Sequence, residues 1–599
     1  MQFVLTASAA ALLLAASPAL GAGVPPSGNA TNPVVNLGSA GSYLGVVQNN
    51  GTVASWKGIP YAEPPVGSLR FMPPKALGAR GSDVIDVTDN ALRCVQFAGA
   101  PYGVINSNIV GPRSGPGQED CLKLWIWKPA KAKAGDKLPV MFYIHGGGLQ
   151  YSAAPNNDFS DWVGQSQDFV AVNVGYRLGA LGFMAHPDLP SANAGLLDQR
   201  QALRWVKQNI AAFGGDPGDV TVMGQSGGGY AVVSQMVLYD GDNQGLFSKA
   251  VPRSVQRSPS FRVDELADRN AEYFELLNCT GGQAQLDCFR GASVPALVNA
   301  YNALLKYKAS SGPSANETLG PASEFNNLTF GSSGAFLPMI DGVTLTDSVS
   351  RLFKKGKVAK VKTVVGFVND EGANTAPRNT SALDPTTNGI WNLTDSQVKQ
   401  AASYYPNNST FGYASPDNFF PTLFKSYIMA LSPFGEQGIT GSERLVGRYT
   451  SKAVGENKVW AFRFNAPGVG TNYSSTTNPY PLNYVAHSAD NSYLQNATAV
   501  MTPFEKSLAL EWRAYIGSFI RRGDPNKEKL ATSPTWHSYG ALGAGESVES
   551  PVRLVPQFAY QSNANASLPT STQLEVSQKA QLERVDWWLT DAILDATRV

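Results

Sequence analysis

The chain has 599 residues, of which 43% are hydrophobic and 16% are charged, and its net charge at pH 7 is +1. This is the composition of a globular protein with ample apolar material for a core. The near-zero net charge gives no reason to expect nucleic acid or an anionic membrane as a partner.

An apolar stretch rich in alanine and leucine occupies residues 3–20, and it ends at Ala19-Leu20-Gly21, with small residues at the two positions that a signal peptidase reads. This pattern predicts a signal peptide over residues 1–21, followed by one domain over residues 22–599. The stretch is short for a membrane anchor, and no later segment is apolar and long enough to span a bilayer. The C-terminus carries neither a retention signal nor a lipid-anchor tail. We therefore expect a secreted, extracellular protein without stable membrane association.

Two further features fit secretion. About a dozen Asn-X-Ser/Thr sequons are candidate glycan sites, among them Asn50, Asn316, Asn327, Asn392, Asn472 and Asn496. The four cysteines form two pairs that are local in sequence, Cys94 with Cys121 and Cys279 with Cys288. Neither spacing fits a zinc pattern and no histidine is near, so disulfides are expected.

The predicted elements alternate between strands and helices. A hairpin is expected over residues 42–62, around the turn sequence NNG at 49–51. Apolar runs and periodicity then predict, in chain order, strands at 138–144 and 169–174, a helix at 196–213, a strand at 220–223, a helix at 229–238, strands at 363–367 and 459–464, and long helices at 503–522 and 574–596.

This alternation predicts an α/β protein with a mainly parallel, doubly wound sheet and helices on both faces. Two irregular stretches, residues 255–350 and 375–440, are expected to be insertions. We place them at the carboxyl edge of the sheet, where the active sites of open α/β sheets lie.

The sequence GQSGG at residues 224–228 stands between a predicted strand and a predicted helix. A serine at such a turn, with glycine two positions away on either side, is typical of a nucleophile elbow. The turn is tight enough that a Cβ at either outer position would clash. The pattern alone is weak, but with its flanking elements it predicts that Ser226 is a nucleophile.

A serine nucleophile needs a base, and the chain has only four histidines. His145 opens the sequence HGGG after a strand, which favours an oxyanion hole rather than a base. His186 precedes a proline in a loop and is expected to be structural or at the surface. His487 and His537 both satisfy the order nucleophile, acid, histidine, and spacing favours His487 only slightly.

The acid should follow a strand between the nucleophile and the histidine. Asp370 and Glu371 both follow the predicted strand at 363–367 and precede a glycine. Either carboxylate could orient an imidazole, and the local sequence does not choose between them.

A set of short motifs runs in one order along residues 42 to about 540. They are GIPYA (58–62), LRF (69–71), EDCL (119–122), HGGG (145–148), YRLG (176–179), NAGLLDQ (193–199), FGGDP (213–217) and DEG (370–372). With them the chain resembles the type-B carboxylesterases, a family of α/β-hydrolase fold that includes secreted fungal esterases and lipases and the animal cholinesterases.

The resemblance implies roles that spacing leaves open. It implies a triad of Ser226, Glu371 and His487, with an oxyanion hole formed by the N–H groups of Gly147, Gly148 and Gly227. It also matches both cysteine pairs to family disulfides, and the pairs Arg70–Glu119 and Arg177–Asp198 to buried structural ion pairs. The implied reaction is hydrolysis of a small-molecule carboxylic ester through an acyl-enzyme. It implies no cofactor and no metal, and it leaves the oligomeric state open.

The chain also departs from the family pattern. Gly227 stands where alanine is usual, and Gln225 replaces the glutamate of cholinesterases. Ser254 falls where the family has a buried serine near the acid, but Val255 replaces the glycine that follows it. His537 stands where proline is more usual and inherits no role.

Three alternatives remain within this resemblance. A triglyceride lipase would carry a longer amphipathic lid between the first two cysteines, whereas residues 95–120 are rich in Gly, Pro and Asn and show no apolar stripe. A cholinesterase needs a tryptophan in this loop, and none is present. A non-catalytic adhesion or binding protein would have lost a triad residue, and this chain keeps a complete set. Soluble esters are therefore the expected substrates.

Overall fold

The structure is a computed structural model that describes residues 32–89, 92–97, 117–281, 284–310, 336–371, 393–405, 436–469, 485–495, 501–539, 551–557, 572–577 and 579–598. Several predicted features lie outside these residues. They are the signal peptide, most of the loop between Cys94 and Cys121, most of the stretch 375–440, and the sequons at Asn316, Asn327, Asn392, Asn472 and Asn496.

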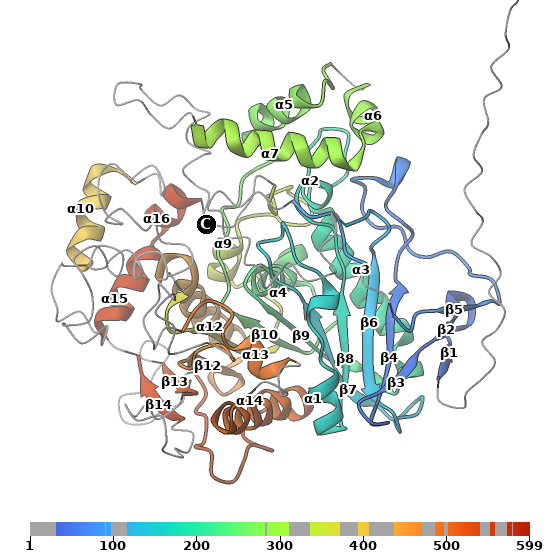
Figure 1. The fold of residues 1–599 in the computed structure, drawn as a ribbon. Helices are drawn as coiled ribbons and strands as arrows, with labels where there is room; N and C mark the ends of the chain where they lie inside the picture. Colours follow the sequence, from blue (N-terminus) through green and yellow to red (C-terminus); the bar gives the residue numbers. More distant parts are fainter. Residues whose placement is uncertain are drawn as a thin grey trace, which may run out of the picture.

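An 11-stranded mixed sheet runs through the molecule in the order β14-β13-β12-β11-β10-β9-β7-β8-β6-β4-β3 (Figure 1). Its strands are β3 (Val46–Gln48), β4 (Val53–Pro60), β6 (Lys123–Pro129), β7 (Leu138–Ile144), β8 (Val170–Val174), β9 (Gly215–Gln225), β10 (Lys249–Arg253), β11 (Lys362–Val368), β12 (Val459–Phe464), β13 (Val552–Val555) and β14 (Gln573–Val576). All pairings from β13 to β8 are parallel, and the outer strands pair antiparallel. The predicted mainly parallel arrangement is confirmed.

A smaller three-stranded sheet lies near the N-terminus of the described chain. It consists of β1 (Val34–Asn36), β2 (Ser42–Leu44) and β5 (Val84–Asp86). The predicted hairpin lies between β2 and β5 in the chain: β3 and β4 pair antiparallel around Asn49 and Asn50, both of which have positive φ.

Helices cover both faces of the large sheet. Residues 140, 142 and 144 of β7 pack in one hydrophobic cluster with α3 (Ala194–Asn209), α4 (Gly227–Val237), α9 (Val349–Lys354) and α12 (Gly441–Val454). Residues 141 and 143 pack in the other with α1 (Ser160–Ser166) and α14 (Pro503–Arg522). Alternate side chains of one strand therefore enter opposite cores, which is why this strand reads as an unbroken apolar run.

The single long helix predicted over residues 574–596 is wrong. Gln573–Val576 forms β14, followed by α15 (Lys579–Trp588) and α16 (Asp591–Thr597). β14 pairs antiparallel with β13, whose backbone groups would otherwise form the sheet edge. Thr590, with extended backbone, is the N-cap residue of α16 and separates it from α15. Strand pairing and the extended backbone of Thr590 thus interrupt the helix that the periodicity predicts.

The insertion over residues 255–350 contains α5 (Ala267–Leu276), α6 (Ala284–Gly291) and α7 (Val294–Ser310), which lie together at one end of the molecule (Figure 1). Tyr301 of α7 donates a hydrogen bond to Gln150 Oε1 at 2.8 Å, and Gln150 Nε2 donates to the Phe336 carbonyl at 2.6 Å. Gln150 follows the carboxyl end of β7. The described part of the insertion therefore lies at the carboxyl edge of the sheet, as predicted.

Both predicted disulfides are present, with Cα–Cα distances of 5.0 Å for Cys94–Cys121 and 5.6 Å for Cys279–Cys288. The predicted ion pairs are present as well. Arg70 forms a two-point contact with Glu119 at 2.5 and 2.6 Å. Arg177 contacts Asp198 at 2.7 and 2.8 Å, and Asp198 is fully buried.

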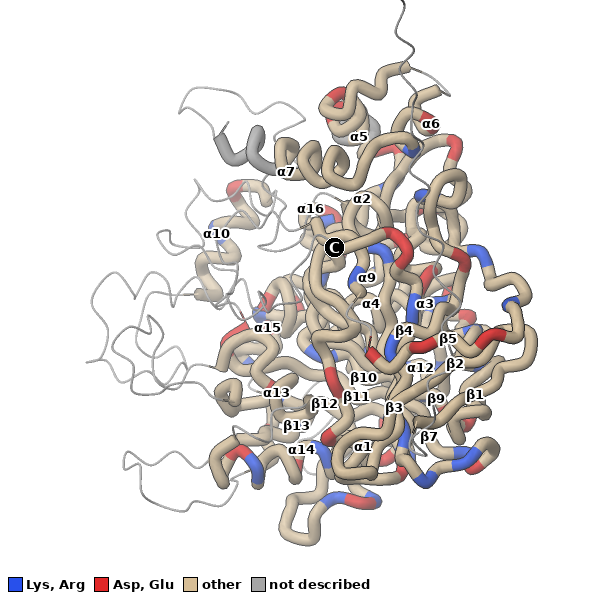
Figure 2. The backbone as a smooth tube through the Cα atoms, turned by 45° about the vertical axis from the view of Figure 1, so that its right-hand side comes forward, with Lys and Arg blue, Asp and Glu red and all other residues tan. Residues whose placement is uncertain are grey.

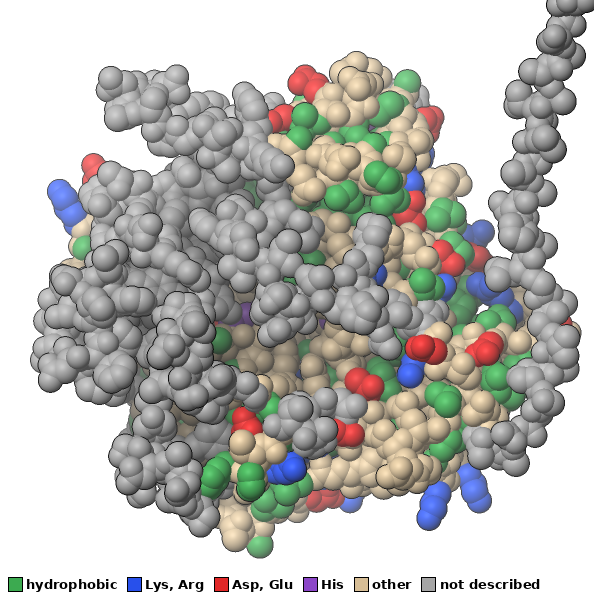
Figure 3. Space-filling model, viewed as in Figure 1, with side chains coloured by type: hydrophobic (Ala, Val, Ile, Leu, Met, Phe, Trp, Pro, Cys, Tyr) green, Lys and Arg blue, Asp and Glu red, His purple; other side chains and the backbone are tan. Residues whose placement is uncertain are grey.

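Charged residues of both signs are interspersed along the described backbone and over the face shown in Figure 3, with neither sign gathered in one patch there (Figures 2 and 3). Across the described part of the chain, no helix combines the length and apolar character needed to cross a bilayer.

Removing Asp198 should destabilise the fold strongly, because it leaves the Arg177 guanidinium buried without a counter-charge. We expect Asp198→Ala to lower the free energy of unfolding by about 3–5 kcal/mol. The exposed pair Lys579–Glu583, 3.8 Å apart, supplies the control: Glu583→Ala should change stability by less than about 1 kcal/mol. Urea unfolding measures both, and similar losses in the two variants would contradict the structural role of Asp198.

Candidate active site

Ser226 occupies a sharp turn between β9 and α4. Its backbone has φ 61° and ψ −126°, a conformation that a non-glycine residue rarely adopts. Two backbone hydrogen bonds hold it there: Ser226 N donates to the Arg253 carbonyl at 3.0 Å, and its own carbonyl accepts from Tyr230 N at 2.9 Å. The strained turn therefore joins a parallel strand to a helix, as predicted for a nucleophile elbow.

The glycines around Ser226 are required by close backbone packing. A Cβ on Gly224 would lie 2.3 Å from the Gly228 carbonyl oxygen, and a Cβ on Gly228 would lie 2.1 Å from the Ile144 carbonyl oxygen. Neither backbone atom can move aside without disturbing β7 or α4. The steric reason predicted for this pattern is confirmed.

The glycine loop after β7 lies against the same turn. Gly147 and Gly148 have φ of 100° and 60°, and a Cβ on Gly227 would lie 2.7 Å from Gly148 N. Within the described residues, no acceptor is bonded to the N–H groups of Gly147, Gly148 or Gly227. Unbonded N–H groups, here established for the described residues only, are what an oxyanion hole requires.

The structure brings Glu371 and His487 together. Glu371 Oε2 lies 2.5 Å from His487 Nδ1, and its Oε1 accepts a hydrogen bond from Val368 N at 2.8 Å. The carboxylate is buried, whereas the imidazole is 17% exposed. Glu371 is therefore anchored to the end of β11 and faces the ring through one oxygen.

Asp370 bonds to the backbone of Val485. Its Oδ2 accepts a hydrogen bond from Val485 N at 2.8 Å, and its own N–H donates to the Val485 carbonyl at 3.2 Å. Burial raises the pKa of Asp370 to about 6. Asp370 thus fastens the loop that carries His487, and Glu371 contacts the ring itself.

The other histidines lie in different surroundings. His145 is buried, stacks on Tyr176 with ring centroids 4.5 Å apart, and has its pKa lowered to about 4 by burial. His186 is buried, and its Nδ1 accepts from Asp188 N at 3.1 Å. His537 is partly exposed beside the buried Trp536. Glu371 contacts His487 rather than His537.

Ser254 is fully buried at the end of β10, with φ 45°. Its N–H donates to the Gly366 carbonyl at 2.7 Å, and its hydroxyl has no hydrogen-bond partner in the described residues. The structure therefore gives no contact of this hydroxyl to the acid.

A polar cluster beside the imidazole was not predicted. Arg253 and Asp490 form a fully buried ion pair at 2.5 Å, and Asn491 and Gln225 continue from it to His487. Two of these residues carried a signal in the sequence: Gln225 departs from the family pattern, and Asp490 is the acid three residues after His487 in a segment that matches the family. Arg253 and Asp490 are 237 residues apart, and no local motif announces their contact.

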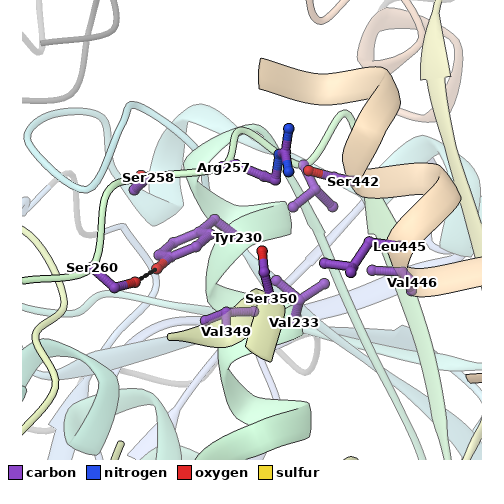
Figure 4. A pocket seen from close by; sticks show the side chains of 11 residues that line it. Tyr230, Val233, Arg257, Ser258, Ser260, Val349, Ser350, Ser442, Leu445 and Val446 are labelled. Atoms are coloured by element: carbon purple, nitrogen blue, oxygen red, sulfur yellow. Dashed lines mark hydrogen bonds between the residues drawn. The ribbon is translucent and has the colours of Figure 1, made fainter. Parts of the chain in front are cut away.

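A small cavity lies beside α4 but is separate from these residues. Its lining includes Tyr230 and Val233 of α4 and Ser442 of α12. The Tyr230 and Ser260 hydroxyl oxygens are 3.4 Å apart, and Figure 4 shows their hydrogen bond. The space holds about one water molecule. It is too small to bind an ester substrate.

Comparisons with known proteins agree with this geometry. A model of the carboxylesterase family matches residues 31–550. The secreted triacylglycerol lipase LIP1 of Gibberella zeae is 30% identical over 534 residues, covering 83% of this chain and 84% of the relative. Secreted lipase 1 of Botryotinia fuckeliana is 30% identical over 555 residues, covering 86% and 89%.

Solved structures agree with the α/β-hydrolase fold. The crystal structure of Aspergillus niger EstA superposes with a TM-score of 0.75 at 25% identity, covering 95% of this chain and 99% of that one. A PNB esterase superposes with a TM-score of 0.68 at 23% identity, covering 93% of this chain and 99% of that one, and supports the fold alone.

The two adjacent carboxylates should be separable by mutation. Glu371→Gln should lower kcat by about 10⁴-fold, because an amide cannot hold the required imidazole tautomer in the same way. Asp370→Asn should cost less than about tenfold, because its amide oxygen can still accept from Val485 N. His537→Ala is the control and should leave most activity. Steady-state ester hydrolysis measures all three, and the reverse order for the two carboxylates would reassign the acid.

Proposed function

Because the chain belongs to the carboxylesterase family, we propose that it is a secreted serine esterase that acts through an acyl-enzyme on Ser226. Its family and relatives show it to be a carboxylic ester hydrolase. The proposal adds the residues and the substrate class. The observation that carries it is the 2.5 Å contact of Glu371 with His487, on a loop bonded to Asp370.

In the first step, Ser226 Oγ attacks the carbonyl carbon of the ester while His487 Nε2 takes the hydroxyl proton. Glu371 holds the Nδ1–H group and stabilises the imidazolium that forms. The carbonyl oxygen gains negative charge, and the N–H groups of Gly147, Gly148 and Gly227 stabilise it. Each such donor typically contributes a few kcal/mol to the transition state.

The tetrahedral intermediate then collapses to the acyl-enzyme. The bond from carbon to the leaving oxygen breaks, and His487 gives its proton to the departing alkoxide. Water next attacks the acyl carbon, again losing a proton to His487. Proton return to Ser226 releases the carboxylic acid and restores the enzyme.

Secretion is part of the same proposal. A signal peptide over residues 1–21 would be removed, leaving one esterase domain over residues 22–599, with sequons available for glycans. Two relatives are named secreted lipases, and disulfides such as Cys94–Cys121 persist in an oxidising compartment.

A triglyceride lipase is the second candidate, and the names of the relatives favour it. The composition of residues 95–120 argues for soluble esters instead. A loop rich in Gly, Pro and Asn without an apolar stripe has little apolar surface that could leave the protein and bind a lipid interface.

Ser226→Ala should abolish ester hydrolysis, with a loss of kcat on the order of 10⁴- to 10⁶-fold. The unfolding midpoint should change little, because only a hydroxyl oxygen is lost. In the parent protein, an organophosphate should label Ser226 and no other serine, which peptide mapping can establish. An active Ser226→Ala protein, or a label on a different serine, would refute the proposed nucleophile.

The two candidate activities differ in their response to an interface. We expect ordinary saturation on a dissolved short-chain triglyceride, with no jump in rate as its concentration passes the solubility limit. Initial rates across that limit, beside a matched water-soluble butyrate ester, provide the measurement. A sharp rise at the limit would replace the esterase proposal with the lipase.

A further inference from the structure

The proton-accepting nitrogen of the proposed base has a neighbour in the structure. Gln225, the last residue of β9, places its Nε2 atom 3.2 Å from Nε2 of His487. This ring nitrogen must receive the Ser226 proton in the proposed reaction, because Nδ1 already faces Glu371. The resting imidazole is therefore held at both of its nitrogens.

A polar relay determines which end of the Gln225 amide faces the imidazole. The Arg253 guanidinium has only donors, and its Nη2 lies 2.7 Å from Asn491 Oδ1. The amide nitrogen of Asn491 therefore faces Gln225 Oε1, at 3.3 Å. This leaves the NH₂ group of Gln225 turned toward His487. Asp490 anchors the start of the relay by its fully buried contact with Arg253.

Because Gln225 donates at this point, His487 Nε2 is the acceptor and Nδ1 carries the ring proton. We propose, building on the proposed function, that Gln225 is a positioning residue that keeps His487 neutral and so preserves a competent base in mildly acidic solution. An imidazolium would direct its Nε2–H against the amide N–H, a contact between two donors. The relay therefore favours the tautomer that accepts the serine proton. Because Nε2 has a single lone pair, the Ser226 hydroxyl must displace the amide N–H from it when the proton is transferred.

The carboxylates around His487 act in the opposite direction. Burial lowers the pKa of His487, but the charge and hydrogen bond of Glu371 and the charge of Asp490 outweigh it, and the pKa is raised. Asp370 and Arg253 lie on the elements packed against this loop, and each is held by its own partner. A neutral donor at position 225 opposes the rise in the pKa of His487 that the carboxylates cause, whereas a glutamate there would add to that rise.

Gln225→Glu tests the proposal, because it keeps the shape of the side chain and replaces the donor with a charged acceptor. The neutral base is required, so kcat/KM on a soluble p-nitrophenyl ester falls as the pH drops through the pKa of His487. We expect the midpoint of this acid limb to move upward by about one pH unit. The variant would then be roughly tenfold slower than the parent below both midpoints. A midpoint that stays in place or moves downward overturns the proposal.

Asn491→Asp tests the relay itself. The introduced carboxylate can accept from Arg253 but cannot donate to Gln225 Oε1, so the Gln225 amide would turn its oxygen toward the imidazole. The added charge also acts directly, and the same substitution in a Gln225→Met background measures that contribution. A larger upward shift of the midpoint in the parent background supports the relay. Equal shifts in the two backgrounds overturn it.

The outcomes separate this proposal from the one on which it rests. A folded parent without esterase activity contradicts the proposed function. If the parent is active and Gln225→Glu leaves the midpoint of its acid limb unchanged, only the role of Gln225 is contradicted. A purely structural effect would lower kcat/KM at every pH and leave the midpoint unchanged, and unfolding midpoints identify variants that are not folded.

Discussion

The candidate active site is organised by a steric constraint in the backbone around Ser226. A Cβ on Gly224 or Gly228 would lie within 2.3 Å of a carbonyl oxygen, so the turn closes only because side chains are missing there. The same closeness presses the loop after β7 against the first residue of α4. The proposed nucleophile and the three candidate oxyanion donors therefore form one backbone unit, whose geometry does not depend on flexible side chains.

Parallel strands bring the remaining groups to this unit. β9, β10 and β11 are neighbours and all run in the same direction, so their carboxyl ends meet at one edge. Ser226 follows β9, Arg253 ends β10, and Glu371 follows β11. The loop that bears His487 is tied to this edge by the backbone and side chain of Asp370. The sheet topology thus brings residues that are distant in the sequence into one cluster.

Much of this arrangement could be predicted because it is encoded locally. The strand at 138–144 and the helix at 503–522 have the predicted bounds; the helix has a capping box at Thr502 and Glu505 and a left-handed Gly523 at its end. The helix predicted over residues 574–596 is wrong because pairing with β13, a non-local interaction, decides the state of its first residues.

The site residues that belong to a local sequence motif could be predicted, and the others could not. Asp370 and Glu371 are adjacent and chemically alike, so the strand pattern could not separate the one that bonds the backbone of Val485 from the one that contacts the ring. Arg253 and Asn491 contact each other although they lie 238 positions apart along the chain. Such contacts depend on packing in three dimensions, and no periodicity or spacing records them.

The glycine at position 227 bears on how this chain can evolve. A Cβ there would lie 2.7 Å from Gly148 N and 2.9 Å from Leu149 N, although the family resemblance makes alanine the usual residue. An alanine acquired alone would displace the loop of candidate oxyanion donors, whereas one acquired after that loop has shifted would be tolerated. We therefore expect positions 227 and 147–149 to be epistatic, so that the order of substitutions decides which intermediates remain active.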